Sequence, residues 1–445
     1  MNPFSRRTLG SMLLAPAAAW LTPRLSAQGC APPPGGQPVN FTHVAGLQNV
    51  TRKAISTLTP AEVTRLRLAY SRLRDLNTSD AADPRGHMQQ ANVHCWQCGG
   101  SGMDIHQSWS FLPWHRCYLY FHERILCKLL NDNSFRLPFW DWDTVAGRSL
   151  PAVYRPATVG PTPNSIFDAK RSAAASGGSP MPGAIFPAAS NPMNAANFAA
   201  FGGSAGSGGG LENGPHGAIH VWTGGSGDMG SLATAARDPV FFAHHCQIDR
   251  LWSEWVRRNP VAHANPTAAA FLSRSFLFFD ENKKWTRIKI SDVVTTPSLG
   301  YSYLPGAAMA KPAPATWIEL TVDTSSGAIK FPADFNANPP ANALVRKRAL
   351  IVEDAVLPNQ TGIYNIFLGD PPATGADQAV APNYVGYMGI ILGEHVHEGK
   401  STLVLNANQQ FMQQAAGPGA VLTFAEAGTT QATKLTFTNV YLTEE

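Results

Sequence analysis

The thirteen histidines of this 445-residue chain are unevenly distributed, and their clustering makes them the first candidates for functional residues. Five lie between residues 87 and 122 and four between residues 216 and 245, on opposite sides of a long segment rich in Gly, Ala, Ser and Pro. Imidazole is the commonest metal ligand in proteins. Two clusters placed in this way suggest two metal ions.

The second cluster combines a helical pair with two adjacent histidines. His216 and His220 are four residues apart, so on a helix both imidazoles would lie on one face, about a turn apart. This spacing alone is weak, because such a pair is more often incidental. The segment RDPVFFAHHCQIDRLW adds His244 and His245, followed one turn on by Asp249. That carboxylate could accept the second ring N–H of a ligand and fix its tautomer.

The first cluster contains His94, His106 and His115. A straight helix could not bring the last two to one metal, because nine residues rotate the chain by about two and a half turns. Pro113 offers a break that would allow it. His122, seven residues after His115, is expected to be a core histidine or a neighbour of the ligands.

The type of ligand then selects the metal. Six neutral imidazoles without carboxylates suit copper. Zinc needs four ligands in a structural site and performs no oxygen chemistry, so it explains two trios poorly. Two trios with open positions could face each other and hold oxygen between metals about 3.5–4 Å apart. The sequence therefore predicts two copper ions as cofactors, with O2 as co-substrate.

The first residues of the chain predict an export signal. The paired arginines of SRRTL precede an apolar run and small residues near Ala27. This twin-arginine pattern predicts a cleaved signal over residues 1–27 and a periplasmic or secreted protein, with a disordered tail as the alternative. The rest of the chain has no basic stripe suited to nucleic acid and no apolar run of about 18 residues, so neither nucleic acid nor a membrane anchor is expected.

Two cysteines next to the first cluster leave several interpretations open. Cys95 and Cys98 form a CxxC pair between His94 and His106. A zinc knuckle would need a second pair, and c-type haem would need a histidine where this chain has Gly99. A reversible dithiol is disfavoured outside the cytoplasm, where disulfides are stable.

Helical patterns surround the histidines, and β-like patterns follow them. Residues 59–77 have apolar side chains at helical spacing after a Thr-Pro start, and LPWHRCYLYFHERILCKLLND and PVFFAHHCQIDRLWSEWVRRN fit two more helices. Residues 149–211 are expected to form long loops. Beyond residue 315, runs such as RALIVEDAVL and GIYNIFLG predict short strands. A helical domain is therefore followed by a small all-β domain, with the boundary in residues 299–315.

These motifs together resemble a known family. DPRGHMQQANVHCWQCGG, HQSWSFLPWHRCYLYFHERIL, LPFWDWD, LENGPHGAIHVWTG, RDPVFFAHHCQIDRLW and FLFFDENKKW are similar to segments of the type 3 copper polyphenol oxidases, the tyrosinases and catechol oxidases. They look closer to the plant-type enzymes than to the short bacterial ones. The resemblance runs from about residue 60 to residue 305, and it continues more loosely around RKRALIVEDAVLP.

The resemblance implies a mainly α fold, in which a four-helix-bundle dicopper core with long loops is followed by a small all-β C-terminal domain. The implied domains are a tyrosinase domain over residues 28–305, a linker over 306–315 and a β-rich domain over 316–445. The implied ligands are three histidines for each copper, with His244 as a neighbour. They are His94, His106 and His115 for the first copper and His216, His220 and His245 for the second.

The same resemblance assigns the cysteines. It implies a disulfide between Cys30 and Cys95 and a thioether between Cys98 and His106, which would hold that ligand in place. The other three cysteines are expected to be buried free thiols. Two of them, ten residues or about 15 Å apart on one predicted helix, are too far apart to form a bridge. These three are Cys117, Cys127 and Cys246.

The implied reaction is oxidation of small phenols by O2. O-diphenols become o-quinones, with some ortho-hydroxylation of monophenols, and a catechol oxidase without monophenolase activity is the alternative. Glu212 matches a glutamate that holds a water near the second copper, although it could simply be a first-turn carboxylate. Gly217 stands where an asparagine is thought to favour hydroxylation, and Leu232 where a phenylalanine often covers the second copper. Both differences suggest a roomy site that favours catechols.

The β domain has two interpretations. In plant-type precursors the comparable domain covers the copper site, so this chain could be a latent zymogen that a protease activates. Alternatively, the domain only stabilises the fold. A different class of function also stays open, because the same copper site serves as a reversible oxygen carrier in molluscan haemocyanins.

Overall fold

The structure is a computed structural model that describes most of the chain between residues 36 and 444, together with Cys30. The expected signal over residues 1–27 and the expected linker over 306–315 lie outside the described residues. The described ranges are 30, 36–44, 49–99, 105–186, 191–303, 316–323, 328–331, 348–356, 358, 360–372, 378, 381–391, 400–407, 411, 413, 420–437 and 439–444.

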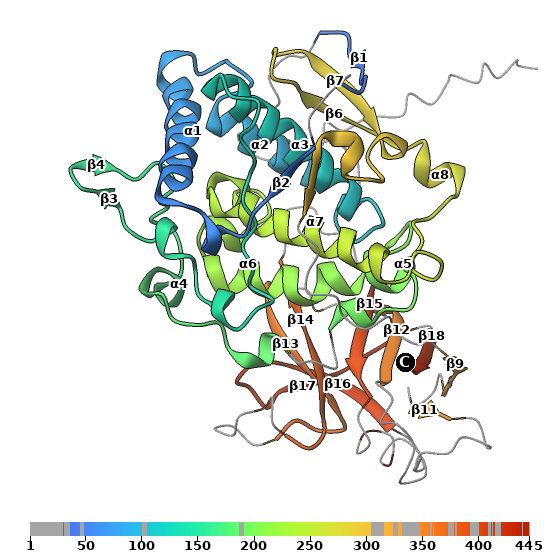
Figure 1. The fold of residues 1–445 in the computed structure, drawn as a ribbon. Helices are drawn as coiled ribbons and strands as arrows, with labels where there is room; N and C mark the ends of the chain where they lie inside the picture. Colours follow the sequence, from blue (N-terminus) through green and yellow to red (C-terminus); the bar gives the residue numbers. More distant parts are fainter. Residues whose placement is uncertain are drawn as a thin grey trace, which may run out of the picture.

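Helices form the larger part of the molecule, as the sequence predicts (Figure 1). The three long helices expected from the sequence are present as α1, α3 and α7. The α-helices are α1 (Pro60–Ser79), α2 (His87–Gly99), α3 (Phe111–Leu130), α4 (Ala173–Gly177), α5 (Phe198–Gly202), α6 (Gly217–Gly224), α7 (Val240–Arg258) and α8 (Ala269–Leu272).

Local sequence explains where the long helices begin and end. Thr59 and Glu62 form a capping box at the start of α1, where each side chain satisfies a free backbone N–H of the first turn. α3 is buried along most of its length and ends at Leu130, where the next residue, Asn131, has a left-handed backbone. α3 packs against both α1 and α7, so it forms the centre of the helical part.

The long segment between the two histidine clusters contains only short elements. A two-stranded hairpin, β3 (Thr158–Val159) with β4 (Thr162–Pro163), projects from the surface in Figure 1. Short 3-10 turns, α4, α5 and β5 (Ser207–Gly208) make up much of the rest. This agrees with the expectation of long loops over residues 149–211.

Small sheets tie the flanking segments to the helices. β1 (Val39–Asn40) and β6 (Ser275–Phe279) lie on either side of β7 (Trp285–Lys289). β2 (Val50–Arg52) pairs in parallel with β8 (Tyr301–Tyr303). These pairings bring the start of the helical part next to its end.

The C-terminal part is a sandwich of two sheets with its own apolar core. One sheet has the order β10-β11-β16-β13-β14 with β17 beside β16, and the other has the order β5-β15-β12-β18-β9. The strands are β9 (Thr316–Glu319), β10 (Thr321–Asp323), β11 (Ala328–Lys330), β12 (Arg348–Val356), β13 (Gly362–Leu368), β14 (Tyr384–Ile390), β15 (Lys400–Asn406), β16 (Ala420–Glu426), β17 (Ala432–Lys434) and β18 (Asn439–Glu444).

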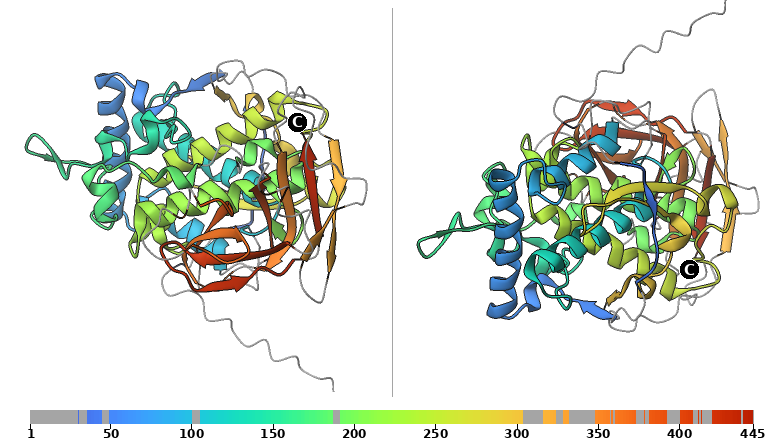
Figure 2. Two further views of the ribbon diagram at one scale, coloured as in Figure 1. Left: turned by 90° about the horizontal axis from the view of Figure 1, so that it is seen from below. Right: turned by 90° about the horizontal axis from the view of Figure 1, so that it is seen from above.

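The β sandwich packs directly against the helices, below them in Figure 1 and nearer to the viewer than they are in the left view of Figure 2, which is seen from below. β15 pairs in parallel with β5 of the helical part. Ile351, Tyr387 and Tyr441 belong to the apolar core of the helical part rather than to that of the sandwich. The two parts therefore share a buried, apolar interface, and the predicted fold class is confirmed.

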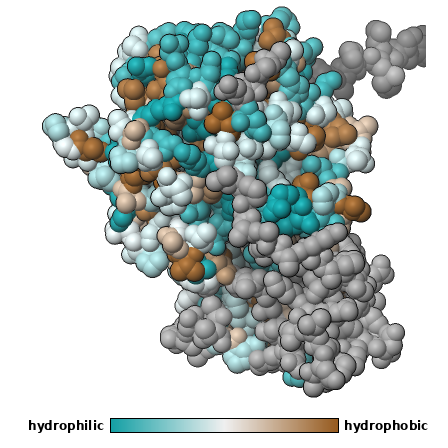
Figure 3. Space-filling view, in the orientation of Figure 1, coloured by the Kyte–Doolittle hydropathy of each residue, from teal (hydrophilic) through white to brown (hydrophobic). Residues whose placement is uncertain are grey.

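Apolar side chains are scattered among hydrophilic ones on the face shown in Figure 3. Isolated apolar residues of this kind are normal on a protein surface. Among the described helices, none combines the length and the apolar character that a membrane span requires.

Candidate metal centre

Three histidines from separate segments form a first trio. The ring centroid of His94 lies 5.4 Å from that of His106 and 5.6 Å from that of His115, and the latter two lie 5.2 Å apart. His94 belongs to α2 and His115 to the first turns of α3, whereas His106 precedes that helix. α3 begins at Phe111, so the predicted break at Pro113 is wrong. The chain turns before α3 starts, and Pro113 lies in the first turn of the helix. Backbone N–H groups there have no acceptor within the helix, so the N–H that proline lacks costs no hydrogen bond.

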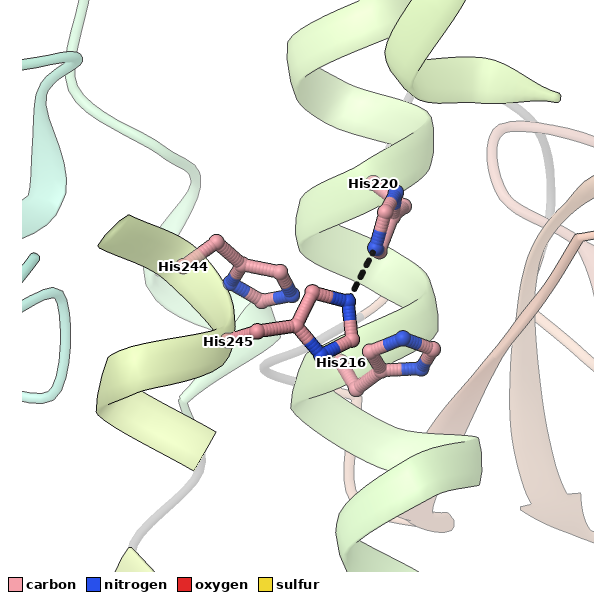
Figure 4. A group of neighbouring side chains, drawn as sticks. All are labelled: His216, His220, His244 and His245. Atoms are coloured by element: carbon pink, nitrogen blue, oxygen red, sulfur yellow. Dashed lines mark hydrogen bonds between the residues drawn. The ribbon is translucent and has the colours of Figure 1, made fainter. Parts of the chain in front are cut away.

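A second trio lies on α6, α7 and the short helical segment η7 (Glu212–His216) (Figure 4). The ring of His216 lies 4.7 Å from that of His220 and 5.1 Å from that of His245, and the latter two rings are 5.5 Å apart. The rings of His115 and His245 stack at 4.1 Å. The two trios therefore face each other across the helical core.

Backbone carbonyl groups fix the tautomer of four of these imidazoles. A carbonyl can only accept a hydrogen bond, so the Nδ1 atom beside it carries the proton, and the Nε2 atom of the neutral ring has a free lone pair. The Nε2 atoms of His115 and His216 are buried without a hydrogen-bond partner. The Nδ1 contacts are His94 with Leu232 (2.9 Å), His115 with Phe111 (2.8 Å), His216 with Glu212 (3.2 Å) and His220 with Met229 (2.8 Å).

The donor atoms of the second trio lie at a spacing that suits one cation. The Nε2 atoms of His220 and His245 are 3.3 Å apart. Two nitrogens that each lie about 2.0–2.1 Å from one tetrahedral metal are separated by about this distance. The Nε2 atom of His106 in the first trio is also buried without a hydrogen-bond partner. The second trio therefore fits a metal ion by the spacing of its nitrogens, and in the first trio the donor atoms of His94 and His106 lie within 4.8 Å of each other.

Burial keeps all six imidazoles neutral. It lowers the pKa of His220 to about 4 and, with repulsion from His220, that of His106 to about 3. Burial also lowers the pKa of the other four well below the usual value. A neutral imidazole is the form that binds a metal, so no proton has to be displaced. Neutral nitrogen donors without a carboxylate match copper.

His244 lies beside the second trio but has a different tautomer. The indole Nε1–H of Trp142 donates to the Nδ1 atom of His244 at 3.1 Å. The single proton of a neutral His244 must therefore lie on Nε2, which cannot then bind a metal. Figure 4 shows His244 and His245 side by side on α7. The hydrogen bond from Trp142 thus favours His245 as the ligand of this pair.

The cysteines of the CxxC pair have separate partners. Cys30 and Cys95 form a disulfide, as predicted. The Sγ atom of Cys98 lies 3.5 Å from the Nδ1 atom of His106 and 3.5 Å from both ring nitrogens of His94, while the residue itself is a free cysteine here. The thioether stays a prediction, for which this proximity is the geometric requirement.

The remaining predicted neighbours lie in the core. Cys117, Cys127 and Cys246 are buried free thiols, as expected. His122 stacks on Phe242 at 3.6 Å and lies outside both trios.

Asp249 does not have the role that its spacing suggests. Its carboxylate accepts hydrogen bonds from Arg116 at 2.5 Å, Tyr301 at 2.7 Å and Tyr303 at 2.6 Å. Arg52 lies 3.5 Å away, and both arginines are buried. Buried cations require a paired anion, and backbone carbonyls hold the imidazoles instead. Asp249 therefore joins the helical core to β2 and β8 and does not orient a metal ligand.

A cavity of about 40 Å³ leads to the centre. This volume has room for roughly three water molecules, since one water needs about 10–15 Å³. The β sandwich supplies one side of the cavity through the last residues of β14 and the residue that follows. The lining residues are His106, Gln107, Glu212, His216, Gly217 and Leu232 from the helical part and Gly389, Ile390 and Ile391 from the sandwich.

Gln107 is a contact of the predicted site that sequence reasoning missed. Its backbone is left-handed, with φ of +52°. This conformation turns its N–H toward Glu212, whose Oε1 atom accepts at 2.9 Å, and its side-chain Nε2 donates to Asn213 at 2.8 Å. Its position directly after His106 was the only signal in the sequence. Gln107 therefore links a member of the first trio to the predicted water-holding glutamate.

Two family models match the chain. The common central domain of tyrosinase matches residues 84–184 and 168–258, and the polyphenol oxidase middle domain matches residues 265–319. The chloroplastic polyphenol oxidase of Vitis vinifera is 37% identical over 260 residues, which cover 50% of this chain and 42% of that protein. The chloroplastic catechol oxidase B of Solanum tuberosum is 33% identical over 297 residues, which cover 55% of this chain and 47% of that protein. The chain spans about half the length of these curated relatives.

Solved structures show the same fold. Latent apple tyrosinase superposes with a TM-score of 0.69 at 23% identity, over 91% of this chain and all of that chain. Grenache (Vitis vinifera) polyphenol oxidase has a TM-score of 0.56 at 29% identity, over 64% of this chain and 93% of that chain. The fold and the paired trios define a type 3 copper protein. Within that class, the chain belongs to the polyphenol oxidases.

The comparisons contradict the predicted localisation. Most of the curated relatives are chloroplastic plant enzymes, which points to a plastid rather than to export into the periplasm or the medium. The prediction of twin-arginine export is therefore wrong. The prediction depended on a short motif and an apolar run. Such a pattern indicates a targeting segment, but it does not identify the membrane that the segment crosses.

Proposed function

We propose that this chain is an enzyme that uses two copper ions and O2 to oxidise o-diphenols to o-quinones. The observation that carries the proposal is the pair of facing trios, whose imidazoles are neutral and whose side chains are buried except for the half-buried His106. When bound, the copper pair would supply the activation of O2 and accept the electrons of the phenol. His94, His106 and His115 are the proposed ligands of the first copper. His216, His220 and His245 are those of the second.

The residues around the trios would hold the ligands and handle protons. The carbonyl of Leu232 fixes the ring of His94, so this residue contributes to the first trio as well as to the cavity wall. Glu212 lies in the cavity wall, where its carboxylate could hold a water and accept the phenolic proton. The hydrogen bond from the backbone of Gln107 keeps that carboxylate beside His106. Position and proton transfer are thus the contributions of the protein.

We also propose that the β domain makes the intact chain latent. Gly389, Ile390 and Ile391 form one wall of the narrow cavity that His106 and His216 also line. Cleavage within the proposed linker over residues 306–315 would let the domain of residues 316–445 leave the tyrosinase domain of 28–305. An activating protease is therefore a proposed partner, in addition to small phenolic substrates.

Two other functions are distinguishable from this one. A catechol oxidase without monophenolase activity is favoured by Gly217, because an asparagine is absent at this position. An oxygen carrier is suggested only by fold, since a functional unit of octopus haemocyanin superposes with a TM-score of 0.54 at 18% identity, over 88% of this chain and 99% of that chain.

Oxygen uptake by the copper-loaded chain tests the proposal. The assay compares tyrosine with dopa, before and after limited proteolysis. Consumption of dopa after cleavage supports a polyphenol oxidase, and consumption of tyrosine as well adds monophenolase activity. No uptake with either substrate after cleavage would contradict the proposed function and favour an oxygen carrier.

A further inference from the structure

Two glycines lie back to back where the β sandwich meets the second trio. Gly217 is the first residue of α6 and directly follows His216, and Gly389 lies near the end of β14. A Cβ atom on Gly217 would lie 2.1 Å from the carbonyl oxygen of Gly389. A Cβ atom on Gly389 would lie 2.0 Å from the backbone nitrogen of Ala218. Neither position can carry a side chain while the strand is seated.

The local backbone does not require glycine at either position. Gly217 has helical angles, with φ of −61° and ψ of −44°, which every residue type adopts. Gly389 lies in a regular antiparallel ladder opposite Ile363. Glycine is disfavoured inside both helices and strands. The two glycines therefore serve the close approach of one backbone to the other.

We infer that the contact between Gly217 and Gly389 is the docking point that holds β14 over the metal centre, so that residue 217 determines whether the intact chain admits substrate. The inference rests on the proposed function. The residues that follow Gly389 are Ile390 and Ile391, which line the cavity, and Tyr387 two positions earlier is buried in the helical core. A side chain at either glycine would push the strand away and withdraw both isoleucines from the entrance.

Residue 217 thus affects both the docking of β14 and the substrate specificity of the site, and the two place different requirements on its side chain. An asparagine at residue 217, the residue expected to favour hydroxylation of monophenols, would place its Cβ atom against the carbonyl of Gly389. An asparagine there and a seated β14 exclude each other. A gain of monophenolase activity through Gly217→Asn would therefore be accompanied by loss of latency in the intact chain.

The test uses Gly389→Ala in the intact, copper-loaded chain. This substitution lies in the β domain, outside the proposed metal ligands. Forcing a methyl group into packed atoms destabilises the closed arrangement, and the expected result is roughly a tenfold or larger rise in catechol oxidation by the uncut chain. Gly362→Ala is the matched control, because a Cβ atom there comes no closer than 3.3 Å to another atom, one in the ring of Tyr364.

Hydrogen exchange supplies a second readout that does not depend on turnover. In Gly389→Ala, the amides of β14 and of α6 should exchange faster than in the wild type or in Gly362→Ala, since both elements lose their shared contact. If Gly389→Ala does not fold, as judged by circular dichroism, Gly217→Ala places a methyl group on the other side of the same contact and is measured in the same way.

The outcomes separate this inference from the proposed function. Faster exchange without catechol oxidation by any variant, even after proteolysis, would support the docking point and contradict the polyphenol oxidase. A different result would overturn the docking point alone. The enzyme would oxidise catechol after proteolysis, but intact, folded Gly389→Ala would oxidise catechol as slowly as the intact wild type, and its amides in β14 and α6 would exchange as slowly. An intact wild-type chain as active as the cleaved one would also overturn it.

Discussion

The two histidine trios are held by different kinds of structure. In the second trio, His216 and His220 lie one turn apart on consecutive helical segments, and His245 lies on the facing helix α7. In the first trio, two members lie on helices, but His106 lies in an irregular segment that precedes α3. The second trio is therefore positioned by helical geometry. The first trio also depends on the contacts that hold the irregular segment of His106.

This difference predicts where the centre is fragile. Helical hydrogen bonds are repeated along α6 and α7, so one lost contact shifts a ligand there only slightly. His106 lies outside the helices, and Cys98 and the segment at Gln107 are among its neighbours. We therefore expect the first trio to be the more sensitive of the two to changes outside its ligands.

The largest effect is expected from substitution of a ligand of the helical trio. His245→Ala should abolish measurable catechol oxidation of the cleaved enzyme and lower the copper content from two ions per chain to about one. His244→Ala is the matched control. His244 lies beside the proposed ligands, and loss of such a neighbour lowers metal affinity or activity by roughly 10–100-fold at most. Oxygen uptake and metal analysis check both variants. The reverse order of effects would make His244 the ligand and contradict the tautomer that Trp142 imposes.

A smaller effect is expected from Cys98→Ser in the irregular trio. Without the sulfur, His94 and His106 both lose a neighbour at 3.5 Å, and copper binding to the first trio should weaken roughly 10–100-fold while the second trio is unaffected. Competition with a chelator measures the two affinities. Cys127→Ala, a buried thiol far along α3, should leave both unchanged. If the thioether forms, the wild-type peptide that joins Cys98 to His106 is lighter by two hydrogen atoms.

Equal copper affinities in Cys98→Ser and the wild type, together with a peptide of unmodified mass, would show that His106 needs no anchor. The comparison between the two trios would then lose its main chemical basis.

The left-handed backbone of Gln107 allows a finer test of the same segment. Gln107→Ala should lower the free energy of unfolding by about 1 kcal/mol, because the hydrogen bond to Asn213 is lost. Gln107→Gly loses the same bond but relieves a left-handed conformation that costs other residues roughly 1–2 kcal/mol. The glycine variant should therefore be close to the wild type in urea unfolding. A glycine variant less stable than the alanine variant would show that the backbone at Gln107 is not strained.

The sequence predicts the parts of the site that follow from local periodicity. The long helices, the pairing of His216 with His220 and the place of His115 near the start of a helix all follow from spacing along one element. The choice between His244 and His245 could not be derived in this way, because it depends on Trp142, which is about a hundred residues distant in sequence.

Contacts between distant backbones account for the other differences. Asp249 is one turn from His245, and only the fold brings Arg116, Tyr301 and Tyr303 to its carboxylate. Gly217 was interpreted from the sequence as a matter of substrate specificity. Its contact with Gly389, 172 positions later, is not visible in any local pattern.

An effect no larger than that of Gln107→Ala is expected in the turn that precedes α2 and therefore supports the first trio. Burial alone would raise the pKa of Asp83, but hydrogen bonds from Arg85 and Lys283 lower it to about 2. A carboxylate whose pKa is depressed in the folded state contributes stability above its unfolded pKa of about 3.9, and this contribution is lost as the pH falls toward 2. Asp83→Asn should therefore cost about 1 kcal/mol at pH 7, and the cost should shrink below pH 4.

Urea unfolding of the wild type and of Asp83→Asn at pH 7, 5, 4 and 3 measures this difference in the free energy of unfolding. Protonation of the imidazoles changes the stability of both proteins equally, so it does not contribute to the difference. Asp75→Asn on the neighbouring helix α1 serves as a control, because no ion pair of Asp75 occurs among the described residues. A cost for Asp83→Asn that stays constant down to pH 3 would mean that the carboxylate acts through its shape and not its charge. The charge of the ion pairs before α2 would then contribute nothing to the stability of the turn that precedes His94.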